Sequence, residues 1–247
     1  MASFKDQIDL ANLPSHIAVI MDGNGRWARK KGAARIFGHR NAIQAVTDVT
    51  EACGELGIKY LTLYAFSTEN WGRPKDEVEG LMELLVNTLK KEIGNLMENK
   101  VRLTTLGDLA HLPTTCQRNL QEAKDATTNN TGLHVMLALN YSGRWEIVNA
   151  AKKLAEEVRQ GKLQPENIDE GKFAKYLETA GIPDPELLIR TSGEMRVSNF
   201  LLWQIAYTEL YITKTLWPDF RKEDLYEALY AFQQRERRFG KVLEPNA

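Results

Sequence analysis

The chain has 247 residues, of which 43% are hydrophobic and 26% charged, and its 32 basic and 33 acidic residues leave a net charge of −1. This balance excludes a protein whose whole surface binds nucleic acid and a polybasic membrane anchor, although it allows a local cationic pocket. Two cysteines, Cys53 and Cys116, provide neither a disulfide framework nor a metal-ligand spacing. We expect a cytoplasmic protein without a signal peptide or membrane span.

Short apolar segments rich in β-branched residues alternate with longer segments of helical period. This pattern is typical of an α/β fold in which helices flank a mostly parallel central sheet. Strands are predicted at residues 16–21, 60–66, 101–107, 133–140, 187–190 and 209–213. Helices are predicted at residues 33–56, 75–99, 113–127, 144–160, 169–179, 199–206 and 222–239. We expect a single domain over residues 1–247, with flexible tails at 1–13 and 241–247.

Polar segments follow four of the predicted strands. They begin at Asp22, Ser67, Asn140 and Arg190. Because the carboxyl ends of parallel strands open on one edge of a sheet, where open α/β folds bind ligands, we expect these segments to converge there.

The first of these segments contains a glycine motif. Residues 23–28 read G-N-G-R-W-A and match the G-x-G-x-x-A dinucleotide fingerprint, which is weak evidence alone. No acidic residue ends a second strand about 20 positions later, as that fingerprint requires. Asp22 precedes the glycines and would repel a pyrophosphate unless a metal lay between them. Asp22 is therefore either a Mg²⁺ ligand beside a phosphate cradle or the N-cap of the next helix.

Cations gather around the same turn. They are Arg26, Arg29, Lys30, Lys31, Arg35, His39 and Arg40, and further arginines near other strand ends are Arg73, Arg144, Arg190 and Arg196. The planar fork of arginine suits phosphate oxygens, so this clustering indicates an anionic ligand. For residues 29–31 we prefer a solvated surface. Arg35 and His39 lie on one helical face and are expected to address the same phosphate.

A second anion site is predicted at residues 190–200, which combine two arginines, three hydroxyls and a glycine before a predicted helix. Two diphosphate sites on one edge suggest a transferase that joins two phosphorylated molecules. The helix near residues 78–97 carries an apolar stripe. Its ordinary role is core packing, but at about 1.5 Å per residue it is long enough to wall a cavity for an extended hydrocarbon.

Several longer blocks occur in a characteristic order. They read H-I-A-V-I-M-D-G-N-G-R-W-A from His16, G-H-R from Gly38, Y-A-F-S-T-E-N-W-G-R-P from Tyr64, N-Y-S-G-R-W from Asn140, L-I-R-T-S-G-E from Leu188 and R-E-R-R-F-G from Arg235. From about Leu13 to Gly240 the chain resembles the cis-prenyltransferases, in particular the bacterial undecaprenyl diphosphate synthases. The resemblance implies one α/β domain with a hydrophobic tunnel.

The resemblance also implies roles for individual residues. Asp22 would bind Mg²⁺ and help to ionise an allylic diphosphate, and Glu209 would reach the metal, in some descriptions from the partner subunit. The allylic diphosphate would rest on Gly23, Asn24, Gly25, Arg26, Trp27, Arg35 and His39. The diphosphate of isopentenyl diphosphate would be held by Arg190, Arg196, Val197 and Ser198. The reacting groups would be framed by Ser67, Thr68, Glu69, Trp71 and Arg73.

Asn70 matches a position that is often assigned to proton abstraction in such enzymes. Because an uncharged amide is a poor base, we expect Asn70 to orient the substrate while a diphosphate oxygen or Asp22 takes the proton. Thr68 stands where many relatives have serine, which keeps the hydroxyl.

The resemblance implies a Mg²⁺-dependent enzyme that adds isopentenyl diphosphate units to farnesyl diphosphate. Its product would be a long-chain polyprenyl diphosphate near the undecaprenyl length, the precursor of a lipid carrier for cell-wall polymers. The enzyme would be a cytoplasmic homodimer that contacts the membrane to release product. Two alternatives stay open, a dinucleotide-dependent dehydrogenase and a non-catalytic partner subunit of a prenyltransferase. The presence of Asp22, Asn70 and Glu209 favours a working enzyme over the latter.

Overall fold

A computed structural model describes residues 3–236, in which six strands form one parallel sheet of order β3-β4-β2-β1-β5-β6. The strands are β1 (His16–Ile20), β2 (Tyr60–Ser67), β3 (Arg102–Leu106), β4 (His134–Tyr141), β5 (Leu187–Arg190) and β6 (Glu209–Ile212). The predicted α/β class with a mostly parallel sheet is confirmed. Every residue of β1 is buried, as expected for a central strand covered on both faces.

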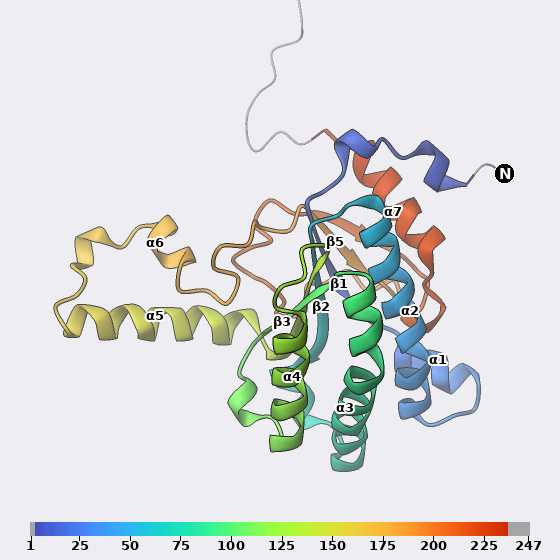
Figure 1. Ribbon diagram of the computed structural model, residues 1–247, viewed down its shortest axis with the longest axis horizontal. Helices are drawn as coiled ribbons and strands as arrows, with labels where there is room; N and C mark the ends of the chain where they lie inside the picture. Colours follow the sequence, from blue (N-terminus) through green and yellow to red (C-terminus); the bar gives the residue numbers. More distant parts are fainter. Residues whose placement is uncertain (1–2, 237–247) are drawn as a thin grey trace, which may run out of the picture.

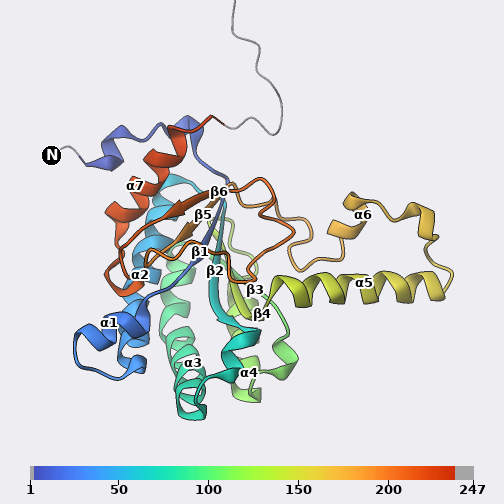
Figure 2. The same ribbon diagram turned by 180° about the vertical axis from the view of Figure 1, so that it is seen from behind.

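Helices surround this sheet unevenly. They are α1 (Asn24–Lys30), α2 (Arg35–Leu56), α3 (Lys75–Glu98), α4 (Thr114–Thr127), α5 (Gly143–Arg159), α6 (Glu170–Ala174) and α7 (Lys222–Gln233). Short 3-10 helices are η1 (Phe4–Gln7), η2 (Leu10–Asn12), η3 (Thr68–Gly72), η4 (Leu109–His111), η5 (Pro165–Asn167) and η6 (Trp217–Asp219). The main apolar core joins α2, α3, α4 and α7 to one face of the sheet, whereas α5 and α6 project away as an arm (Figures 1 and 2).

A second, smaller apolar cluster covers part of the opposite face. It joins Ile20 and Met136 from the sheet to Phe200 and Leu201 from the segment after β5. We predicted a helix at residues 199–206, and this prediction was wrong. Ser198, with φ of 48°, Asn199, with φ of 60°, and Leu201, with φ of 47°, adopt left-handed backbone, which an α-helix cannot contain. Phe200 and Leu201 are buried by a series of turns instead.

The ends of the described chain bear on other predictions. Residues 4–7 and 10–12 form η1 and η2, and Gln233 Nε2 of α7 donates to the carbonyl of Asp9 (2.7 Å). Flexibility of residues 1–13 stays a prediction, and the predicted tail at 241–247 lies outside the described residues. Within residues 3–236, no helix has the length and apolar character needed to cross a bilayer.

The sheet register brings the predicted polar segments together. Ile20, at the end of β1, is level with Tyr64 of β2 on one side and Arg190 of β5 on the other. Asp22 follows two residues later, so its carboxylate lies beside the end of β5 at the carboxyl edge.

Candidate functional site

A cavity of about 370 Å³, which we call the rim cavity, opens at the carboxyl edge of the sheet beside α2 and α3. The predicted site residues that line it are Asp22, Asn24, His39, Ser67, Asn70, Arg73, Arg190 and Ser198. Its inner walls are apolar and include Ile43 of α2, Leu85 of α3 and Leu139 of β4. The cavity therefore has a polar, mainly cationic mouth and an apolar interior.

Asp22 lies between two arginines at this mouth. Arg190 Nη2 donates to Asp22 Oδ2 (2.8 Å), and Arg26 Nη2 lies 3.3 Å from Asp22 Oδ1. Burial alone would raise the pKa of Asp22, but the hydrogen bond and charge of Arg190, with the charge of Arg26, outweigh burial and hold this pKa below its usual value. Asp22 is therefore an ionised carboxylate at neutral pH.

The glycine turn starts α1, but Asp22 does not cap the helix. Gly23 is the N-cap residue, and no side chain makes a capping bond. Its φ of 110° favours glycine, and a Cβ there would lie 2.9 Å from Leu216 Cδ2. The N-cap interpretation of Asp22 is thus wrong, and its carboxylate is left to face the rim cavity.

His39 presents a neutral donor to the cavity. Asn24 Nδ2 lies 3.2 Å from His39 Nδ1, and because an amide nitrogen can only donate, the ring proton is assigned to Nε2. Burial, with the charges of Arg73 and Arg35, lowers the pKa of His39 to about 4. Asn24 Oδ1 is buried and has no hydrogen-bond partner in the described structure. The pair can therefore accept one bond and donate another to a ligand.

Two arginines from opposite sides of the edge meet on a carboxylate that our sequence analysis did not single out. Arg26 Nη1 donates to Glu194 Oε1 (2.8 Å), and Arg196 Nη1 donates to Glu194 Oε2 (2.5 Å). The hydrogen bond from Arg196 and its charge, with those of Arg26, hold the pKa of Glu194 below its usual value. Neither arginine lines the rim cavity itself. Glu194 thus occupies the anion position between the two predicted phosphate-binding groups.

Glu77 likewise pairs with two arginines, at the other side of the mouth. Its carboxylate is 8% exposed and lies 3.4 Å from Arg35 Nη1 and 3.2 Å from Arg73 Nη1. The Arg35 side chain also lies across Gly25, with Nε 2.7 Å from the position of a Cβ there. The sequence signal for Glu77 is its spacing of four residues from Arg73, which lies just before α3, while Glu77 lies in the first turn of that helix.

Asn70 is fixed by the turn that carries it. Its Oδ1 accepts a hydrogen bond from the backbone N–H of Ser67 (3.1 Å), as part of a capping box at the start of η3. The carboxamide oxygen is therefore engaged within the turn, and the NH₂ group is the part left for a ligand. A donor at this point can orient a substrate but cannot accept a proton.

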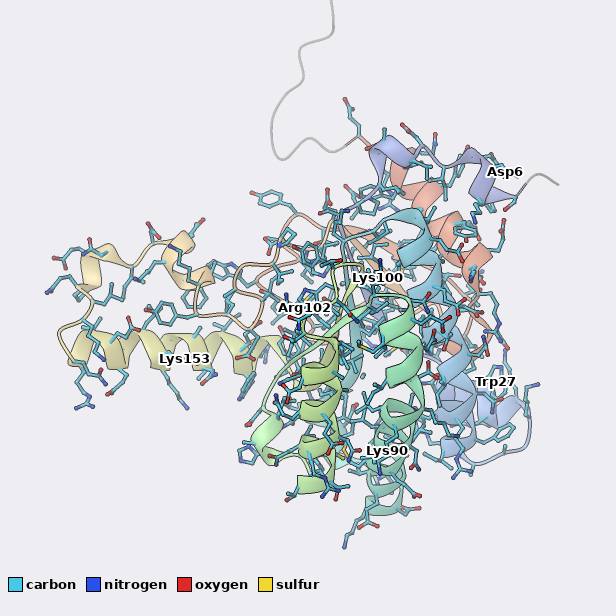
Figure 3. The ribbon with its side chains drawn as sticks, viewed as in Figure 1. Asp6, Trp27, Lys90, Lys100, Arg102 and Lys153 are labelled. Atoms are coloured by element: carbon cyan, nitrogen blue, oxygen red, sulfur yellow. The ribbon has the colours of Figure 1, made fainter. Side chains whose placement is uncertain are left out.

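The remaining predicted site residues lie outside the rim cavity. Trp27, which is labelled in Figure 3, is buried. Its Nε1 donates to Asp219 Oδ1 (2.6 Å), and its ring stacks on Phe37. Thr68 and Trp71 line a separate hollow next to the mouth. Glu69 and Val197 belong to the loops at the mouth but do not line the rim cavity.

Glu209 lies far from Asp22 within one chain. Through β5 it is level with Ile17, which is five residues before Asp22, or roughly 16 Å at about 3.3 Å per strand residue. Arg235 Nη1 donates to Glu209 Oε2 (2.9 Å) at this end of the sheet. The structure does not bring the two predicted metal ligands together in one chain.

The donor set at the mouth fits Mg²⁺ held jointly with a substrate. Within residues 3–236 no group of three His, Cys, Asp or Glu side chains could hold a metal ion alone. Magnesium is commonly bound by one or two carboxylates together with substrate phosphates. Asp22, at 28% exposure and with carboxylate lone pairs beyond those used by the arginines, satisfies the protein part of that requirement.

A second cavity of about 400 Å³, the far cavity, lies along α2 and α3 toward the other end of the sheet. Both cavities are lined by Ile43, Val46, Leu63, Thr88, Leu89 and Leu137. The far cavity also contacts Glu51, Glu92 and Asn99 near the carboxyl ends of the two helices. The two cavities are therefore neighbours along one mainly apolar path that begins at Asp22.

Several known proteins are similar to this chain in sequence over nearly its whole length. A family model described as putative undecaprenyl diphosphate synthase matches residues 20–240. An isoprenyl transferase of Chlorobaculum tepidum is 54% identical over 232 residues, which cover 94% of this chain and 88% of the relative. A ditrans,polycis-undecaprenyl-diphosphate synthase ((2E,6E)-farnesyl-diphosphate specific) of Pasteurella multocida is 50% identical over 234 residues, or 95% of this chain and 98% of the relative.

The fold has a close counterpart among solved structures. Lavandulyl diphosphate synthase from Lavandula x intermedia, solved in complex with dimethylallyl diphosphate, superposes with a TM-score of 0.91 at 38% identity. The match covers 93% of this chain and 99% of the plant chain.

Proposed function

The chain belongs to the undecaprenyl diphosphate synthase family of prenyltransferases, and from this membership we propose that it condenses isopentenyl diphosphate with farnesyl diphosphate. Successive additions would give a long-chain polyprenyl diphosphate near the undecaprenyl length. Family membership replaces the dehydrogenase interpretation of the glycine turn. The activity is that of a transferase, and the choice of substrates and product length are the proposal.

The observation that carries the proposal is a single carboxylate at a cationic mouth that leads directly into apolar cavities. A growing isoprenoid has a dianionic or trianionic head and an apolar tail. Its binding site therefore needs a cationic part and an apolar part that adjoin each other. Burial of the tail contributes about 0.8 kcal/mol per methylene, so the rim and far cavities together would hold a lengthening chain. This contact supports the hydrophobic tunnel that we expect between α2 and α3.

Asp22 would hold Mg²⁺ together with oxygens of the allylic diphosphate. Bound there, the ion would offset the negative charge that develops on the departing diphosphate. The residues of this chain would supply the remaining stabilisation. His39 Nε2–H and the second N–H of Asn24 Nδ2 would donate to phosphate oxygens from one side of the mouth, and Arg73 would do so from the other.

The isopentenyl diphosphate would bind on the side of the mouth formed by the loop after β5. Arg190 Nη1 donates to Ser198 Oγ (2.7 Å), which places a guanidinium and a hydroxyl next to each other. Arg196 would join them once its carboxylate partner Glu194 gives way to a more highly charged diphosphate. The new carbon–carbon bond forms as the allylic carbon–oxygen bond breaks, and the proton lost from the isopentenyl unit goes to a diphosphate oxygen or to Asp22. The amide of Asn70 would orient the acceptor.

A homodimer would explain the position of Glu209. Since Glu209 lies at the opposite end of the sheet from Asp22 of its own chain, a contribution to the metal would come from a second copy. The arm formed by α5 and α6 and the edge strand β6, with Leu210 43% exposed, are surfaces available to such a copy. In this arrangement each active site draws on both chains.

We place the enzyme in the cytoplasm, where it would release its product at the cytoplasmic face of the membrane. Cys53 and Cys116 are free, buried thiols, which is compatible with a reducing compartment. The product would serve as the precursor of a lipid carrier for cell-wall polymers.

The direct test is incubation of the purified chain with farnesyl diphosphate, labelled isopentenyl diphosphate and Mg²⁺, followed by separation of products by length. We expect incorporation into long-chain products, loss of incorporation on chelation of the metal, and loss in Asp22→Ala. Arg29→Ala, an exposed cation near the same turn, serves as the matched control. Absence of incorporation by the wild-type chain, or near-normal turnover by Asp22→Ala, would contradict the proposal.

A further inference from the structure

Asn70 lies between two neighbours that are each held from outside their own turn. Trp71 Nε1 donates to Asn140 Oδ1 (2.8 Å), and Asn199 Nδ2 donates to Glu69 Oε1 (2.7 Å). We propose that Asn140 and Asn199 are positioning residues that fix η3, and with it the Asn70 amide, at the mouth of the rim cavity. This inference rests on the proposed function, because it assigns a purpose to the placement of Asn70 in that reaction.

Asn140 joins η3 to the loop after β3. Its Nδ2 donates to the carbonyl of Asp108 (2.8 Å), and its own carbonyl accepts from the N–H of Asp108 (3.2 Å). The side chain is buried and the residue has φ of 48°, in the left-handed region. Asparagine is the residue that combines tolerance of this backbone with one short donor and one short acceptor. Trp71 is therefore tied to the sheet through a side chain whose polar atoms are both satisfied.

Asn199 joins the other end of η3 to the start of α5. Its Oδ1 accepts from the N–H of Arg144 (2.9 Å), its carbonyl accepts from the N–H of Gly143 (2.6 Å), and its φ is 60°. It directly follows Ser198, whose hydroxyl accepts from Arg190. Asn199 thus connects the loop that presents Asn70 with the loop proposed to hold isopentenyl diphosphate.

The anchors matter because η3 is weak by itself. It is a five-residue 3-10 helix, a type with poorer hydrogen-bond geometry than an α-helix. A displacement of about 1 Å in a group that positions substrate can reduce turnover roughly 100-fold. Release of either anchor should therefore lower kcat more than it weakens ground-state binding or global stability.

The Asn199 anchor can be broken and rebuilt. Asn199→Asp keeps the bond from Arg144 and tolerates the backbone, but it sets a carboxylate against Glu69. In the double variant E69Q/N199D the introduced amide can donate to the new carboxylate, so the bond is restored with reversed polarity. We expect N199D to lower kcat about tenfold or more with KM for both diphosphates within about threefold, and E69Q/N199D to recover most of the activity of E69Q alone.

The Asn140 anchor is tested by a double-mutant cycle. Asn140→Gly accepts the left-handed backbone and removes both side-chain bonds, and Trp71→Phe removes the donor while keeping an aromatic ring against Phe66. If the bond between them positions η3, the double variant should lose no more kcat than the worse single variant. Asn130→Gly is the matched control, because Asn130 Nδ2 also donates to a carbonyl, that of Val101 (2.8 Å), but away from the site. It should lower the melting temperature and leave kcat unchanged.

The outcomes separate this inference from the proposed function. If the wild-type chain does not condense the two diphosphates, the proposed function fails. If it does condense them, two results would overturn the positioning role. One is an equal loss of kcat from N199D in the wild-type and E69Q backgrounds. The other is additivity of the kcat losses of N140G and W71F. The role would also be overturned if Asn130→Gly lowered the melting temperature and kcat by the same amounts as the anchor variants, since the loss of kcat would then reflect lower stability alone.

Discussion

At the level of single residues, the cations of the site are paired with carboxylates of the same chain. Arg26 and Arg196 share Glu194, Arg35 and Arg73 share Glu77, and Arg190 bonds Asp22. Pairs that are largely exposed, such as Arg196 at 58%, are worth only about 0 to 1 kcal/mol. A diphosphate carries more charge and can accept from several donors at once, so it can replace Glu194 at little cost.

Removal of Arg196 should therefore act on one substrate. We expect Arg196→Ala to raise KM for isopentenyl diphosphate about tenfold or more, the loss of a hydrogen bond between charged groups, with a smaller change for the allylic substrate. Steady-state kinetics with each diphosphate varied in turn gives the comparison. Arg118→Ala, which also breaks an exposed arginine–glutamate pair but lies on α4, is the control. A larger effect on the allylic substrate would mean that the two diphosphate sites are interchanged.

The burial of His16 predicts how the stability of the protein depends on pH. It is fully buried, its Nε2 lies 2.8 Å from Thr62 Oγ1, and burial lowers its pKa from 6.5 to about 4. As pH falls, His16 takes up a proton in the unfolded chain before it does so in the folded protein. The free energy of unfolding therefore falls between pH 6.5 and pH 4, by an amount on the order of 3 kcal/mol. Urea unfolding across this range should show a shallower pH slope for His16→Gln than for wild type. An identical slope in His16→Gln and in the exposed control His111→Gln would contradict the assignment.

At the level of elements, α2 and α3 have a double role as core helices and as walls of the two cavities. Each buries one stripe against the sheet, including Val49 and Val86, while Ile43, Thr88 and Leu89 line the path from the rim cavity to the far cavity. The apolar periodicity of α3 could be predicted from the sequence. Whether space remained beside it could not, because a filled core and a cavity wall have the same pattern.

A bulky side chain at the junction of the cavities should shorten the product. We expect Thr88→Trp to retain the first condensations and to shift the product distribution toward shorter chains, because the indole fills the passage shared by both cavities. Chromatography of the dephosphorylated products provides the measurement. Leu10→Trp, at a 66% exposed position on η2, is the control. An unchanged distribution in Thr88→Trp would exclude this passage as the path of the tail.

At the level of the whole molecule, the sequence predicts the strand-and-helix order well because each strand has a distinct apolar run and turns punctuate the chain. There are two exceptions: α1, which lies where no helix was predicted, and residues 199–206, which are not helical for a physical reason. Phe200 and Leu201 are as apolar as helix residues, but they are buried through left-handed turns that no periodicity reveals. The pairings of Glu77 with Arg35 and of Glu194 with Arg26 were missed for a related reason, since such long-range ion pairs depend on which loops meet. By contrast, eight of the residues predicted for the site do line the rim cavity.

Sharing of residues between two copies is a property of the assembly and can be tested by complementation. Asp22→Ala and Glu209→Gln should each reduce activity. In a mixed dimer of the two variants, one site would combine the intact Asp22 of one chain with the intact Glu209 of the other. We expect co-expression to recover about a quarter of wild-type activity, from half the dimers with one working site each. If Glu209 acted within its own chain, no mixed dimer would have an intact site and no activity would return.

The most direct test of the whole account is a crystal structure of the protein with Mg²⁺, an unreactive farnesyl diphosphate analogue and isopentenyl diphosphate. The account predicts the allylic diphosphate on residues 23–25 with the ion on Asp22, the isopentenyl diphosphate against Arg190, Arg196 and Ser198, and the apolar tail between α2 and α3. Diphosphates bound away from the glycine turn, or an ion bound without Asp22, would contradict it.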